Sequence, residues 1–101
     1  MAKNSSGRLT ESTYAILLAT TEPIHGYGIM SRIKELSKES IVIGPGTLYG
    51  ALKKLMGDGL ISMKLVDDQK IYEVTGAGKE VLKEEFERLE NLIAMSKEVL
   101  G

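Results

Sequence analysis

The sequence contains no cysteine, which excludes both a disulfide framework and a cysteine-based metal site. It has one histidine, His25, and neither a second histidine nor a carboxylate cluster lies beside it in the sequence. A metal-binding role is therefore not expected, and no cofactor is expected. A place in a turn or at a helix cap is the expected role of His25.

The sequence also lacks long apolar runs. No segment approaches the ~20 apolar residues that a membrane-spanning helix needs, and the first residues lack the apolar core of a secretory signal. Cytoplasmic residence is the default expectation. With 101 residues, 43% hydrophobic and 27% charged, the chain is expected to form one domain with a modest core. Residues 1–8 are expected to be a disordered tail.

An excess of basic residues is absent as well, because the net charge is −1 and the pI is about 5.8. Residues 1–75 hold nine Lys/Arg against eight Asp/Glu, whereas residues 76–101 hold four against six. A surface that binds nucleic acid would therefore have to be local, as in a sequence-specific regulator.

What the sequence does contain is a segment typical of a DNA-recognition helix, GPGTLYGALKKL at residues 44–55. A proline after glycine suits the first turn of a helix, and leucines and alanine recur at helical spacing along one face. The other face carries the candidate DNA contacts Thr47, Tyr49, Lys53 and Lys54. Taken alone, such a helix is more often an ordinary solvated surface helix.

The flanking segments favour the DNA-binding interpretation. Thr10 is a good N-cap, and residues 10–19 have the apolar content of a buried helix. Pro23 breaks this helix, and residues 26–36 show the periodicity of a second, amphipathic helix. Ser40–Ile43 is a β-branched run that predicts a short strand.

Residues 60–74 predict a β-hairpin, which in this order is the wing of a winged helix-turn-helix. Lys64 and Lys70 lie on its stem and are expected to reach the phosphate backbone. Asp67 and Asp68 lie at its tip and would be repelled by DNA, so contact is expected from the stem.

Residues 76–101 predict one long helix with a heptad-like apolar seam. Its length, on the order of 35 Å, exceeds what the winged domain needs. A second copy of the chain is the expected partner, and folding back along its own domain is the alternative. The seam residues are Leu82, Phe86, Leu89, Ile93 and Leu100.

Together these motifs resemble the PadR family of bacterial transcriptional regulators, in its short-chain form. The resemblance rests on LTE at 9–11, HGYGI at 25–29, GPGTLYGALKKL at 44–55, GDGLI at 57–61 and YEVTGAG at 72–78. It implies a mostly α fold with a small hairpin wing: a winged helix-turn-helix domain at 9–75 and a C-terminal dimerisation helix at 76–101. It also implies a homodimeric repressor of an inverted-repeat operator in double-stranded DNA.

Some relatives hold flat aromatic effectors between tryptophans, and this chain has no tryptophan, so that mode does not carry over. Many relatives also have arginine where this chain has Glu73, which weakens one backbone contact. A small apolar or aromatic effector is still expected between the first and last helices. The residues expected to line its site are Leu17, Leu89, Ile93 and Met95.

Three classes of function compete. A DNA-binding regulator accounts for the cationic helix and wing, with Thr47 and Tyr49 near base edges. Tyr49 has an alternative role, packing against the second helix or bonding a phosphate. A winged-helix module that binds another protein, not DNA, fits the acidic pI. An enzyme is not expected, because the glycines at 44–46 lack the lysine spacing of a phosphate-binding loop.

Overall fold

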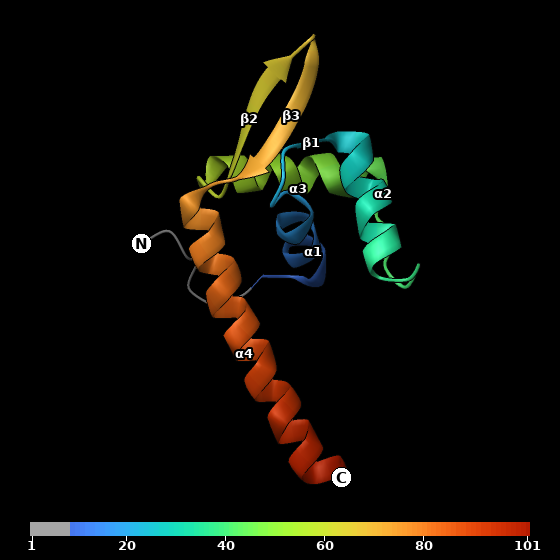
Figure 1. Ribbon diagram of the computed structural model, residues 1–101, viewed down its shortest axis with the longest axis vertical. Coiled ribbons are helices and arrows are strands. Elements are labelled where there is room, and N and C mark those ends of the chain that lie inside the picture. The colour runs from blue at the N-terminus through green and yellow to red at the C-terminus, as the bar shows by residue number, and fades with distance from the viewer. Residues whose placement is uncertain (1–8) are drawn as a thin grey trace.

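The computed structural model describes residues 9–101, and the tail expected at residues 1–8 lies outside the described residues. The mostly helical fold with a small hairpin wing is confirmed. The wing belongs to a three-stranded antiparallel sheet in the order β1-β3-β2. Strands β2 and β3 form a long hairpin that rises on one side of α3, and α4 extends away on the other (Figure 1). The elements are α1 (Glu11–Ala19), β1 (Ile24–His25), α2 (Gly26–Leu36), α3 (Pro45–Gly57), β2 (Ile61–Val66), β3 (Gln69–Val74) and α4 (Gly76–Leu100).

The helix boundaries follow the capping signals of the sequence. The Thr10 side chain accepts a hydrogen bond from the Thr13 amide (3.1 Å) and starts α1. Thr75 starts α4 in the same way by accepting from the Gly78 amide (3.0 Å). Gly59, with φ +76°, takes the left-handed conformation that ends α3 and turns the chain into β2. These predicted boundaries are confirmed.

The wing is a tight hairpin closed by a two-residue turn. Its register runs from Ile61 opposite Val74 to Val66 opposite Gln69. Asp67 and Asp68 in the turn have φ of 52° and 66°, which is the type I′ geometry that matches the twist of paired strands.

The strand predicted at Ser40–Ile43 is wrong. Among the described residues, this run pairs with no strand and forms the loop between α2 and α3. Lys38 and Glu39 just before it have φ of 54° and 66°, which reverses the chain at the end of α2. Ile43 is buried in the core, so the β-branched residues here contribute to packing.

The third strand is instead β1, within the segment that the sequence suggested was a turn. Ile24 pairs with Tyr72 and His25 with Ile71 on the outer edge of β3. Two residues are too few for an alternating pattern, so no periodicity marks them.

One hydrophobic core joins α1, α2, α3 and the base of the wing. The beginning of α4 belongs to it through Val81 and Leu82, but every residue from Asn91 to Leu100 is exposed. The α4 helix therefore does not fold back along its own domain, and the molecule is elongated, with extents of 51 × 34 × 21 Å (Figure 1). Within residues 9–101, no helix is both long and apolar enough to cross a membrane.

Candidate nucleic-acid interface

Helix α3 has one buried face that holds it on the core. Leu48, Leu52 and Leu55 on this face are each at most 2% exposed. Burial of such a side chain contributes roughly 1.5–3 kcal/mol, so this face fixes which side of α3 is left for solvent.

Glycines occupy the middle of the exposed face of α3. At about 100° per residue, Gly46, Gly50 and Gly57 lie within about 40° of one another and opposite the leucines. Thr47 lies on one edge of this face and Tyr49 on the other, about 160° apart. The two residues predicted to read bases therefore point in different directions.

The glycines of α3 differ from glycines elsewhere in the chain. A Cβ atom on Gly46 or Gly50 would meet no atom of the described residues within 4 Å. A Cβ on Gly28 would instead lie 2.8 Å from Ile24, and one on Gly78 would overlap Val74. Packing therefore explains glycine at 28 and 78, whereas no contact of residues 9–101 requires it on the exposed face of α3.

The lysines of α3 are available to phosphates. Lys53 and Lys54 are both exposed, and Lys54 lies 3.9 Å from the Asp58 carboxylate one turn later. That ion pair is solvent-exposed and so contributes little to stability. Lys54 can therefore leave Asp58 and pair with a DNA phosphate instead.

The wing lysines project from opposite faces of the hairpin. Residues directly opposite in an antiparallel pair share a face, and Lys64 lies opposite Ile71 while Lys70 lies opposite Leu65. Both lysines are exposed, and each is about 7–10 Å along the strand from the turn. The wing thus presents one ammonium group on each side.

Tyr49 does not stand free in solvent. The end of its ring lies against Gly26, the buried first residue of α2. The pKa of Tyr72 is raised, mainly by burial and secondly by the nearby Tyr49 phenol. Tyr49 is 47% exposed, which leaves one side of the ring accessible. This arrangement matches the alternative role for Tyr49, packing against the second helix.

A short helix-turn-helix, a wing and a cationic exposed helix are thus combined in one chain, and comparison with known proteins gives the family. Residues 16–84 match the transcriptional regulator PadR-like family. The chain belongs to the PadR-like family. Members of this family are transcriptional regulators, not enzymes, and the winged-helix DNA-binding fold described above is theirs.

Relatives of known source agree with this assignment. The chain is 36% identical over 87 residues to the transcriptional regulator Rv3488 of Mycobacterium tuberculosis, covering 82% of this chain and 76% of that protein. A PadR-like transcription factor from Bacteroides fragilis has a similar structure, with TM-score 0.74 and 28% identity over 87% of this chain and 88% of that one. Bacillus subtilis PadR, solved in complex with operator DNA, has TM-score 0.66 and 30% identity over 74% of this chain and 47% of that one.

The start of α2 holds one residue that the sequence placed correctly and one that it did not single out. The predicted place of His25 at a helix cap is confirmed, whereas Tyr27 was not named. Tyr27, in the first turn of α2, is 71% exposed. His25 occupies the N-cap position of α2, but within the described chain its side chain makes no capping hydrogen bond. Its ring packs over Gly28 instead. The HGYG sequence was the available signal, since two glycines at a helix start indicate close packing.

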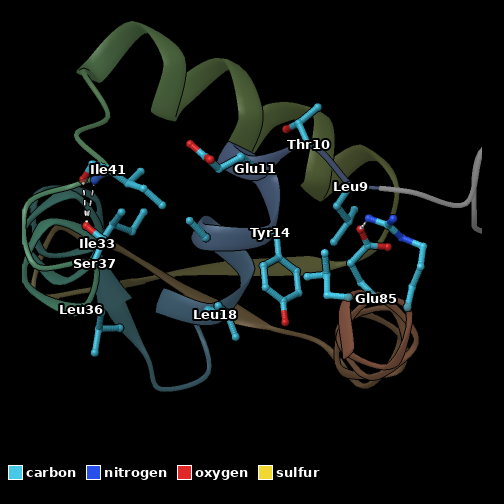
Figure 2. Close-up of a pocket in the computed structure, with 13 residues that line it drawn as sticks. Leu9, Thr10, Glu11, Tyr14, Leu18, Ile33, Leu36, Ser37, Ile41 and Glu85 are labelled. Carbon is cyan, nitrogen blue, oxygen red and sulfur yellow. Dashed lines mark hydrogen bonds and ion pairs between the residues drawn. The ribbon is translucent and has the colours of Figure 1, made fainter. Parts of the chain in front are cut away.

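The predicted effector residues are only partly brought together. A groove of about 500 Å³ crosses the outer side of α1 between the end of α2 and α4 (Figure 2). Leu89 lines it, but Leu17 is fully buried in the core, and Ile93 and Met95 lie farther along α4. The lining residues are Leu9, Thr10, Glu11, Tyr14, Ala15, Leu18, Ile33, Leu36, Ser37, Ile41, Glu85, Arg88 and Leu89.

The groove is mostly apolar, and an ion pair lies at its α4 side. Glu85 is 3% exposed and pairs with Arg88 one turn later on α4. The pKa of the Tyr14 phenol beside this ion pair is raised, mainly by burial and secondly by the nearby Glu85 carboxylate. The groove therefore joins the DNA-binding domain to the dimerisation helix predicted from the sequence.

Proposed function

We propose that this PadR-like protein is a homodimeric, sequence-specific repressor of an inverted-repeat operator. The observation that carries the proposal is the exposed face of α3, where lysines flank glycines that no contact within residues 9–101 requires. A helix with so little bulk on its outer face can lie deep in the major groove. In this arrangement Thr47 reaches base edges from the first turn.

The lysines supply affinity without sequence information. Lys53 and Lys54 hold phosphates beside the major groove, and Lys64 and Lys70 reach the backbone on the two sides of the wing. The acidic tip of the wing stays away from the phosphates.

The free half of α4 supports the proposal of a homodimer. Ile93, Val99 and Leu100 are 55%, 81% and 84% exposed, and Leu92 and Met95 add to the same apolar surface. Exposed apolar surfaces of this kind mark interaction sites, and a two-fold pair of identical helices is the simplest way to cover them. Phe86, Leu89, Ile93 and Leu100 form the proposed seam. Leu82 belongs to the core of its own chain.

The groove beside α1 supports a second, separate proposal, that a small apolar or aromatic molecule releases the protein from DNA. Its volume lies in the range of small-molecule sites, and both α1 and α4 form its walls. A ligand there would favour a different angle between α4 and the DNA-binding domain, and thereby a different spacing of the two α3 helices. The naphthyl probe N-phenyl-1-naphthylamine tests it: fluorescence should rise on binding and fall in Leu18→Asp. Unchanged fluorescence in Leu18→Asp would contradict a site in this groove.

A salt titration tests DNA binding itself. Four lysines per subunit neutralise roughly six to eight phosphates per dimer, so log affinity should fall with log salt with a slope of about −5 to −7. Lys54→Ala should weaken operator and random duplex alike and flatten the slope by about one unit per lysine removed. Absence of binding at low salt would favour the alternative, a winged-helix module that binds another protein.

A further inference from the structure

Besides the buried leucines of α3, one aromatic side chain of the recognition helix packs against the start of α2, at a glycine. Gly26 is buried at the start of α2, and the hydroxyl end of the Tyr49 ring occupies the space beside it where a Cβ atom would stand. A Cβ atom at position 26 would lie 2.9 Å from Cζ of Tyr49 and would overlap its hydroxyl. With alanine at position 26, either the end of the Tyr49 side chain or the start of α2 must therefore shift.

The wing is connected to the same place through β1, the strand directly before Gly26, which pairs with β3. The buried Tyr72 of β3 is close enough to Tyr49 for the two phenols to interact electrostatically. Tyr72 is also the pairing partner of Ile24 in β1 and of Met63 in β2. Because β1 leads directly into Gly26, Tyr49 packs at the point where the wing, through β1, joins the start of α2.

Building on the proposed function, we propose that Tyr49 is a positioning residue: its ring, wedged on Gly26, sets the angle of the recognition helix relative to α2 and the wing. Thr47, on the opposite edge of the exposed face, then reads the bases without help from Tyr49. The three Tyr49 atoms nearest to position 26 are the hydroxyl, Cζ and Cε1. In this proposal the two ring carbons are sufficient for positioning. Gly26 is glycine because the ring needs its surface.

Conservative and disruptive variants separate positioning from reading. Tyr49→Phe keeps the ring, so its affinity for an operator selected from random duplex DNA should stay within about twofold of wild type. Tyr49→Ala should lose tenfold or more. Its preference at every operator base pair, measured on singly substituted operators, should remain that of wild type. Equal losses in Tyr49→Phe and Tyr49→Ala, or lost preference at one symmetric base pair, would overturn the inference.

A double variant tests the contact between Tyr49 and Gly26. Gly26→Ala should lower operator affinity tenfold or more in the wild-type background. In the Tyr49→Ala background, where the space is vacant, it should change affinity less than twofold. Additive losses would contradict the wedge, and circular dichroism melts identify any variant that fails to fold. Tyr49→Phe decides the matter if Gly26→Ala does not fold. A wild-type protein that binds no selected duplex would refute the proposed function together with this inference, whereas wild-type binding with an intolerant Tyr49→Phe refutes the inference alone.

Discussion

Replacement of Gly50 by alanine should stabilise the fold and weaken DNA binding at the same time. Gly50 lies inside α3 with a helical backbone, and a Cβ there would meet no atom of residues 9–101 within 4 Å. Glycine inside a helix costs roughly 0.5–1 kcal/mol relative to alanine, so the variant should gain about that much. At fixed protein concentration the midpoint of thermal unfolding should rise by a few degrees, since a stability gain of about 1 kcal/mol corresponds to ~4–8 °C for a small domain.

On DNA the same methyl group stands in the middle of the exposed face. If α3 lies deep in the major groove, operator affinity should fall at least tenfold, which is about 1.4 kcal/mol. Gly57→Ala is the matched control, because Gly57 is on the same face ~10 Å farther from the helix start. Melting curves and fluorescence anisotropy on a labelled operator measure both effects. A Gly50→Ala protein that is more stable and binds like wild type would refute close approach of this face.

Three further outcomes are expected. Leu89→Glu with Ile93→Glu should give monomers in sedimentation, because two carboxylates per chain would be buried in the seam; an unchanged dimer would place the interface elsewhere. Leu82→Ala should instead lower the unfolding free energy by about 2–5 kcal/mol, as for a core leucine, and leave the association state of the folded protein unchanged. Because burial raises the pKa of Tyr72 above 10.0, the unfolded chain loses this proton first, and the unfolding free energy should fall as pH rises above about 10. Tyr72→Phe should lessen that fall in denaturant titrations at several pH values, and an unchanged slope would contradict it.

Local signals in the sequence were sufficient for most of the fold. Thr10 and Thr75 cap helices through contacts three residues away, and Gly59 ends α3 by its own backbone conformation. The strand predicted at Ser40–Ile43 failed because β-branched residues favour burial as much as pairing, and here Ile43 is buried without pairing. The two residues of β1 are in a strand because of the neighbouring β3, and nothing local indicates it.

The candidate site was predictable to the level of faces. The spacing of the leucines gave the exposed side of α3, but not that Tyr49 bends back onto Gly26 across the helix-turn-helix. Leu17 and Leu18 are adjacent on a helix that is apolar on several sides, so sequence alone could not tell which faces the groove. Leu82 continues the seam in spacing, yet it packs inside its own chain because α4 begins against the core.

Sequence-specific DNA binding is tested most directly by selecting bound fragments from random duplex DNA. The affinity for the most enriched sequence is then measured. We expect enrichment of an inverted repeat whose half-sites are about 34 Å apart, one turn of the duplex. We also expect at least about 10³-fold tighter binding to it than to random duplex at physiological salt. No enriched sequence, or equal affinity for selected and random DNA, would contradict sequence-specific DNA binding.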